Sequence, residues 1–224
     1  MSTFVLVPGA GGDSWYWHRV VPLLEQAGHS PIDLEQPGDD ARAGLDLYVD
    51  RTLTAMADRR DVILVAQSLG GFTAAMVCAR VPVRMLVLVN AMIPLPDETA
   101  GDWWDHVGST AARVEAARRH GYSPEFDVST YFLHDLPPDV LAASDKHARP
   151  EADVVFGQPC RFERWPKVPI HVVVARHDRV LPVELQKKIV HERLGRSADE
   201  VDGGHLVALS NPRRLADRLL SYLG

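Results

Sequence analysis

Short, uninterrupted apolar runs alternate with helical patterns along most of the chain, and this alternation constrains the fold most strongly. Four runs lack the polar alternation of a strand with one face in water, and they occupy residues 4–7, 62–66, 85–89 and 170–175. Such strands are buried on both faces, as in a parallel sheet. Helical patterns occupy residues 17–27, 45–58, 72–80, 183–194 and 213–223. The sequence therefore predicts an α/β fold, with a mostly parallel sheet and helices on both of its faces.

Two weaker strand candidates, residues 31–34 and 197–201, bring the expected sheet to about six strands. The alternation stops between residues 94 and 166, where aromatic residues, prolines and short helical patterns replace strong strands. We predict one folding unit, in which residues 1–93 and 167–224 form the core and residues 94–166 form a small helical cap. An apolar insertion between two strands is a candidate lid. The alternative is a helical layer that completes the core.

The aromatic residues of the insertion are the candidates for a substrate pocket. If the cap covers a site, we expect Trp103, Trp104, Tyr131 and Phe132 to line it. The insertion offers no cluster of lysine or arginine for a fixed anionic group. We therefore expect small to medium, largely neutral and apolar substrates.

The charge balance and the cysteine count restrict the partners and the compartment. The formal net charge is −6 and no lysine or arginine stripe occurs, so we expect no nucleic-acid partner. Residues 1–7 lack a basic start and a long apolar run, so we expect no signal peptide, no membrane span and a cytoplasmic location. Cys78 and Cys160 form neither a disulfide framework nor a metal-ligand spacing. The oligomeric state is left open.

The most specific local pattern is a buried strand followed at once by a serine and then by a helix. Residues 62–71 read VILVAQSLGG, which places Ser68 at the turn between the two elements. A nucleophile elbow needs small residues two positions either side of its serine, because the strained turn packs the helix tightly against the strand. Ala66 and Gly70 meet that need, although glycine is usual at the first position. The alternative is a serine that only caps a helix.

A nucleophilic serine requires a base, and the base requires an orienting acid. Asp178 follows the 170–175 run on a loop before a helical pattern, and His205 follows the last strand candidate after Gly203 and Gly204. Each of the two has a more common structural role, as a helix N-terminal acid or a loop histidine. Together, in the order Ser68, Asp178, His205, they predict a catalytic triad.

The opening of the chain carries a resemblance to a known family. Residues 4–12 read FVLVPGAGG and are followed by WYW at 15–17. With the triad order, this segment resembles the α/β-hydrolase fold family, in particular the small plant-type methylesterase and hydroxynitrile lyase subgroup and its bacterial esterase relatives. The resemblance implies that the backbone N–H groups of Ala10 and Leu69 form an oxyanion hole. Pro8 stands where a histidine is typical of the subgroup.

Two positions favour ester hydrolysis over cyanohydrin cleavage. The lyases of the subgroup carry a threonine at the position of Gly9 and a lysine just after the catalytic histidine, where this chain has Leu206. A leucine offers neither a charge nor a donor to a departing cyanide. We therefore expect a carboxylesterase-type serine hydrolase that acts through an acyl-enzyme and needs no metal or organic cofactor.

Three other functions remain open on this sequence. A thioesterase uses the same residues, and a non-catalytic ligand-binding relative keeps the same fold. A nicotinamide-dependent oxidoreductase is the third, because Gly9, Gly11 and Ser14 partly match a dinucleotide fingerprint and Asp33 stands near the position of a ribose-binding acid. That partial match leaves Ser68, Asp178 and His205 without a role.

Overall fold

The computed structural model describes residues 1–224 and contains one six-stranded sheet in which every pair of neighbouring strands is parallel. The strand order is β2-β1-β3-β4-β5-β6. The strands are β1 (Thr3–Val7), β2 (Ser30–Asp33), β3 (Val62–Gln67), β4 (Met85–Val89), β5 (Ile170–Ala175) and β6 (Asp199–Val201). The predicted α/β fold with six strands is confirmed, including its two weaker strands.

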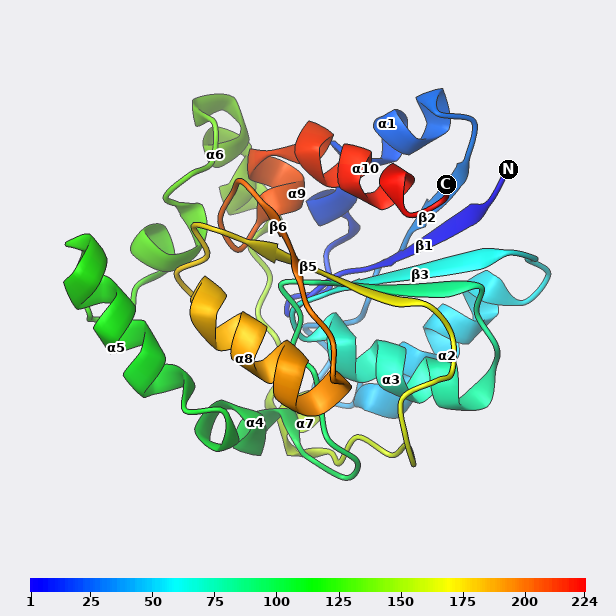
Figure 1. Ribbon diagram of the computed structural model, residues 1–224, viewed down its shortest axis with the longest axis horizontal. Coiled ribbons are helices and arrows are strands. Elements are labelled where there is room, and N and C mark those ends of the chain that lie inside the picture. The colour runs from blue at the N-terminus through cyan, green and yellow to red at the C-terminus, as the bar shows by residue number, and fades with distance from the viewer.

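Ten α-helices and three short helices of other pitch surround the sheet. The α-helices are α1 (Val21–Gln26), α2 (Leu45–Met56), α3 (Gly70–Arg80), α4 (Ala100–His106), α5 (Ser109–His120), α6 (Pro138–Ser144), α7 (Asp153–Gly157), α8 (Val183–Leu194), α9 (Val207–Ser210) and α10 (Pro212–Ser221). The others are η1 (Ser14–Trp17), η2 (Ser129–Leu133) and η3 (Asp145–His147). Figure 1 shows α1, α9 and α10 on one face of the sheet and α2, α3 and α8 on the other.

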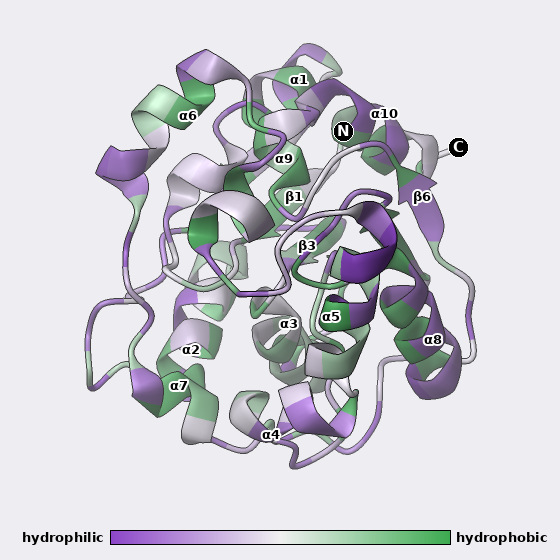
Figure 2. Ribbon diagram, turned by 90° about the vertical axis from the view of Figure 1, so that its left-hand side faces the viewer, coloured by the Kyte–Doolittle hydropathy of each residue, from purple (hydrophilic) through white to green (hydrophobic).

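The apolar strands are buried on both faces because helices cover both. Along β1, Val5 and Val7 belong to the core beneath α2 and α3, whereas Phe4 and Leu6 belong to the core beneath α1 and α10. All four side chains are fully buried. In Figure 2, α8 carries both green (hydrophobic) and purple (hydrophilic) residues, as a helix with one face on the core does. The continuous apolar runs are thus the sequence pattern of strands between two helical layers.

One helix begins later than the sequence pattern indicates. In place of the expected helix over residues 17–27, the chain forms η1, then a short connection and then α1. Helix α1 begins at Val21 and carries Pro22 in its first turn. Proline lacks a backbone N–H and is best tolerated where a helix starts. None of the helices combines the length and the apolar character needed to cross a lipid bilayer.

The segment between β4 and β5 contains α4, α5, α6 and α7, and it adds no strand to the sheet. Because all strands are parallel, the loops after β1, β3, β5 and β6 meet at one edge of the sheet. This edge is where α/β sheets bind ligands. Residues from these four loops form the site described next.

Candidate active site

Ser68 lies in a sharp turn between the end of β3 and the start of α3. Its φ is 49°, a left-handed conformation that side chains other than glycine seldom adopt. A Cβ at Gly70 would lie 2.7 Å from the Pro8 carbonyl oxygen, and one at Gly71 would lie 2.0 Å from that of Met92. Only glycine therefore permits α3 to pack this closely behind the serine. This strained turn between strand and helix has the geometry that a nucleophile elbow requires.

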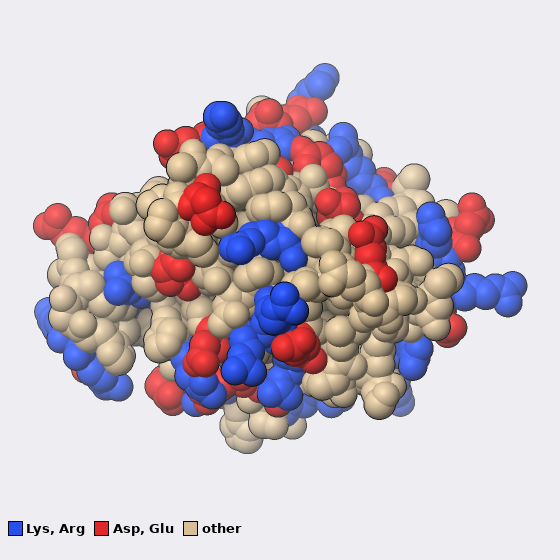
Figure 3. Space-filling view, turned by 90° about the horizontal axis from the view of Figure 1, so that it is seen from above, with Lys and Arg blue, Asp and Glu red and all other residues tan.

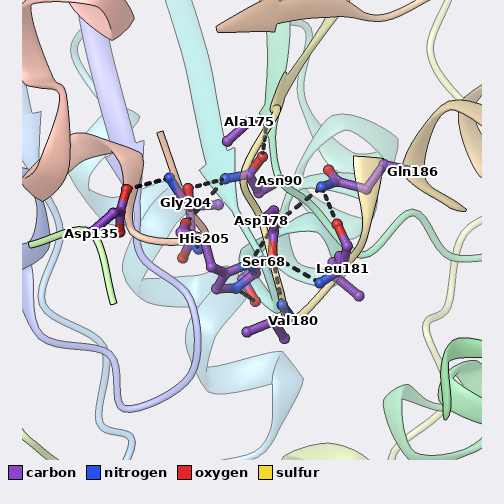
Figure 4. Close-up of polar contacts among 11 residues, drawn as sticks. Ser68, Asn90, Asp135, Ala175, Asp178, Val180, Leu181, Gln186, Gly204 and His205 are labelled. Atoms are coloured by element: carbon purple, nitrogen blue, oxygen red, sulfur yellow. Dashed lines mark hydrogen bonds and ion pairs between the residues drawn. The ribbon is translucent and has the colours of Figure 1, made fainter. Parts of the chain in front are cut away.

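The structure brings Ser68, His205 and Asp178 together in one hydrogen-bonded chain (Figure 4). The His205 Nε2 lies 3.1 Å from the Ser68 Oγ, and its Nδ1 lies 2.8 Å from the Asp178 Oδ2. His205 and Asp178 are 1% and 4% exposed, so this pair is shielded from water, whereas Ser68 is half-buried. A neutral imidazole fits these contacts when Nδ1–H donates to the carboxylate and Nε2 accepts from the serine hydroxyl.

The Asp178 carboxylate is held by donors from its own loop and from α8. Its Oδ1 accepts the N–H groups of Val180 at 2.9 Å and Leu181 at 2.8 Å. Its Oδ2, which faces His205, also accepts from the Gln186 Nε2 at 3.1 Å. An ionised carboxylate only accepts hydrogen bonds, and these four donors satisfy both oxygens. The carboxylate is thus fixed in place against the imidazole.

The loop that carries His205 depends on its two glycines. Gly203 has a φ of 143°, which favours glycine. A Cβ at Gly204 would lie 2.6 Å from the Asp135 Oδ1, and the Gly204 N–H donates to the same carboxylate. Asp135 belongs to the segment between β4 and β5, and no sequence motif pointed to it.

Asn90, directly after β4, also holds this loop. Its Nδ2 donates to the carbonyl oxygens of Gly204 at 3.2 Å and His205 at 3.1 Å, and its Oδ1 accepts the Ala175 N–H at 2.7 Å. Asn90 is fully buried and has a φ of 44°. Asparagine tolerates this conformation better than most residues. One side chain therefore joins the loop after β4, the end of β5 and the loop after β6, a role that sequence reasoning missed.

Two backbone N–H groups near Ser68 have no hydrogen-bond acceptor in the protein. They belong to Ala10 and Leu69, and both residues line the cavity at the serine. A Cβ at Gly9 would lie 2.4 Å from the Gln67 Oε1 and 2.9 Å from the Ser68 Cβ. The glycine loop therefore packs against the elbow itself. Free N–H groups beside a nucleophile are the donors that an oxyanion hole requires.

A cavity of about 430 Å³ opens above the serine. Besides Ser68 and His205, it is lined mainly by apolar side chains, among them Met92, Trp104, Phe132, Leu133, Leu206 and Leu209. The Phe132 ring packs edge-on against the His205 imidazole, with ring centres 5.2 Å apart. A site of this size and lining fits a small organic molecule.

The expected pocket aromatics divide into two groups. Trp104 and Phe132 line the cavity, whereas Trp103 and Tyr131 are fully buried in the core, so their assignment to the pocket is corrected. The Trp103 Nε1–H donates to the Ile93 carbonyl at 3.0 Å, and the Tyr131 hydroxyl donates to the Ser123 carbonyl at 2.9 Å. Each buried ring thus has an internal acceptor for its polar group and needs no contact with water or substrate.

Several ionisable groups are affected by burial. Burial raises the pKa of the Tyr16 hydroxyl and of the Glu151 carboxyl, and both residues line the cavity. Burial also raises the pKa of the Cys78 thiol to about 12, so it stays protonated and unreactive.

No group of three or more His, Cys, Asp or Glu side chains is arranged to hold a metal ion.

Comparison with known proteins identifies the family. Residues 4–218 match the Alpha/beta hydrolase family, so the chain belongs to that family. The fold and the family resemblance expected from the sequence are confirmed.

Several plant proteins are similar over nearly the whole chain. The chain is 28% identical to salicylic acid-binding protein 2 of Nicotiana tabacum, with 97% of this chain and 95% of that protein covered. It is 26% identical to alpha-hydroxynitrile lyase of Arabidopsis thaliana, with 96% and 95% covered. The crystal structure of polyneuridine aldehyde esterase superposes with a TM-score of 0.81 at 20% identity, covering 100% of both chains. Methylesterases are also among the relatives, in agreement with the expectation of an ester-cleaving hydrolase.

Proposed function

We propose that the protein is a carboxylesterase-type serine hydrolase in which Ser68 is the nucleophile, His205 the base and Asp178 the orienting acid. The observation that carries this proposal is the buried hydrogen-bonded chain that ends at Ser68 beside two free backbone N–H groups. The similarity of the protein to methylesterases supports the same class of reaction, ester hydrolysis.

The geometry supports a two-step reaction. Ser68 Oγ attacks the ester carbonyl while His205 Nε2 takes its proton, and the resulting oxyanion accepts hydrogen bonds from the N–H groups of Ala10 and Leu69. His205 then returns the proton to the leaving alcohol, which leaves an acyl group on Ser68. Water, deprotonated by His205, attacks this acyl-enzyme, and His205 returns the proton to the Ser68 Oγ as the acid is released. Asp178 keeps the imidazole in the required tautomer and stabilises its charged form.

Two observations disfavour the lyase alternative. Leu206 lines the cavity next to His205 and provides no cation for a departing cyanide. A threonine at position 9 would also collide with Gln67 and Ser68, because even a Cβ there would lie 2.4 Å from the Gln67 Oε1. Thioesters remain chemically equivalent substrates for the same residues.

We further propose that residues 94–166 act as a cap over the site. In support, Trp104, Val128, Phe132 and Phe156 all line the cavity, and all come from this segment. The apolar lining favours neutral acyl or alcohol groups of small to medium size.

Figure 3 shows lysine and arginine interspersed with acidic side chains on the face seen from above. Cys78 and Cys160 are free thiols, which supports the cytoplasm as the proposed compartment.

Hydrolysis of p-nitrophenyl butyrate by the wild type and by Ser68→Ala tests the proposed function. The variant should keep its fold but lose about 10⁴-fold or more in kcat, because triad residues act as a unit. Ser144→Ala is the matched control, since Ser144 also lines the cavity but donates only to the Leu141 carbonyl. Equal turnover by wild type and Ser68→Ala contradicts the proposal. Turnover of mandelonitrile without ester hydrolysis indicates the lyase instead.

A further inference from the structure

The loop that provides the Ala10 N–H is confined by two distant segments. Gly11 and Gly12 have φ values of 84° and 69°, both in the left-handed region. Glycine also has wide conformational freedom, so the loop needs other contacts to hold it in one conformation. A Cβ at Gly11 would lie 2.7 Å from the Arg149 carbonyl oxygen, and one at Gly12 would lie 2.4 Å from that of Gln36. The loop is therefore packed between Gln36, in the chain after β2, and Arg149 of the cap.

A carboxylate from the cap holds this loop directly. The Glu151 Oε2 accepts the Gly11 N–H at 2.7 Å across 140 residues of sequence, and its Oε1 accepts the Tyr48 hydroxyl of α2. The neighbouring Ala152 N–H donates to the Gly38 carbonyl at 2.7 Å. Glu151 lies in the wall of the catalytic cavity but does not belong to the triad. Its partners are both uncharged, and burial raises its pKa.

The position of this contact gives it a catalytic consequence. A backbone N–H stabilises an oxyanion only when it is aimed at the developing charge before the reaction begins. The Gly11 N–H is one peptide unit beyond the Ala10 N–H, so an acceptor for the first limits rotation of the second. Pro8, at the start of the loop, has neither a backbone N–H nor a polar side chain for this task.

We propose that Glu151 is a positioning residue for the oxyanion hole, whose carboxylate, oriented by Tyr48, fixes Gly11 and thereby aims the Ala10 N–H at the substrate oxyanion. This inference rests on the proposed esterase function. The effect depends on the reach of the acceptor and not on its negative charge, because a negative charge beside an oxyanion opposes its formation.

Two conservative variants separate reach from charge. Glu151→Gln removes the charge but keeps a carbonyl for the Gly11 N–H and an amide for the Tyr48 oxygen. Glu151→Asp keeps the charge but is one methylene shorter and does not reach both partners. Tyr48→Phe removes the orienting hydroxyl. Tyr222→Phe is its matched control, because the Tyr222 hydroxyl donates to the Asp199 carboxylate at 2.6 Å outside the catalytic cavity.

The assay compares kcat and KM for p-nitrophenyl butyrate with inhibition by a trifluoromethyl ketone, whose hemiketal oxyanion occupies the same hole. Removal of one oxyanion donor costs about 10²–10³-fold in kcat, and a misaimed donor should cost about tenfold. Glu151→Asp should therefore lose about tenfold in kcat and in ketone affinity, with KM within about twofold. Glu151→Gln and Tyr222→Phe should stay within about threefold of the wild type, and Tyr48→Phe should lie between.

Three results overturn the inference. Wild-type kcat and ketone affinity in Glu151→Asp show that the contact does not aim the donor. A loss in Glu151→Gln as large as that in Glu151→Asp shows that the reach of the acceptor does not set the effect. A wild type without Ser68-dependent ester turnover refutes the proposed function and this inference with it, whereas normal Ser68-dependent turnover in Glu151→Asp refutes the inference alone.

Discussion

Replacement of Asn90 by alanine should destabilise the protein and displace the catalytic histidine at the same time. The change leaves the buried Ala175 N–H without its acceptor and removes the donor shared by the Gly204 and His205 carbonyls. An orphaned buried donor costs about 1–3 kcal/mol, and each carbonyl that loses a partner adds about 1 kcal/mol. Alanine at a φ of 44° adds about 1 kcal/mol of backbone strain. The total is about 5 kcal/mol of unfolding free energy.

A thermal melt and an esterase assay measure the two effects of this change. For a chain of this length, about 5 kcal/mol corresponds to a Tm lower by about 10–20 °C. Below the melting transition, kcat/KM should fall about tenfold, because a small displacement of a catalytic group costs one or two orders of magnitude.

Asn211→Ala is the control for Asn90→Ala. The exposed Asn211 Nδ2 donates to the Asp202 carbonyl at 3.0 Å in the same loop, outside the catalytic cavity. Its loss should cost about 1 kcal/mol or less. An Asn90 variant with the Tm and the kcat/KM of Asn211→Ala would refute the reasoning.

Three further predictions concern the acid, the cavity and the pH dependence of stability. Asp178→Asn should fold but lose about 10³–10⁴-fold in kcat, measured with p-nitrophenyl butyrate, because an amide disfavours the required imidazole tautomer. In a series of p-nitrophenyl esters, kcat/KM should rise up to about fourfold per added methylene and then fall once the cavity is full, and Trp104→Ala with Phe132→Ala should move the maximum to longer chains. A continuous rise in the wild type argues against a closed pocket. Although burial of Glu98 opposes ionisation, its contacts with Arg193 leave the pKa of this carboxyl lower than in the unfolded chain. Urea unfolding should therefore show that Glu98→Gln costs most stability near neutral pH and progressively less as the pH falls through the folded-state pKa. A pH-independent cost contradicts this assignment.

The strands and the grouping of the three residues of the proposed triad were predictable because their signals are local. A strand between two helical layers must be apolar at every position, so β1, β3, β4 and β5 stand out as continuous apolar runs. Ser68, Asp178 and His205 each directly follow a strand or its short loop, and parallel strands bring these positions to one edge of the sheet. Chain order and strand direction therefore sufficed to group them.

The pocket and the supporting contacts were not predictable in the same way. Trp103 and Trp104 are adjacent in α4, and only the rotation of this helix against the core decides which ring reaches the cavity. Glu151 contacts Gly11 across 140 residues, and no local pattern marks either residue for the other. No local pattern marks Asn90 either. Its role follows from its contacts with the end of β5 and with the loop that carries His205.

We propose Ser68 as the nucleophile of an esterase. Peptide mass mapping after reaction with a fluorophosphonate tests it most directly, because the reagent forms a stable bond with an activated serine and imitates the tetrahedral intermediate. We expect one phosphonyl group per chain, attached to Ser68, and no labelling of Ser68→Ala. Labelling of another residue, or of the Ser68→Ala protein to the same extent as the wild type, would contradict it.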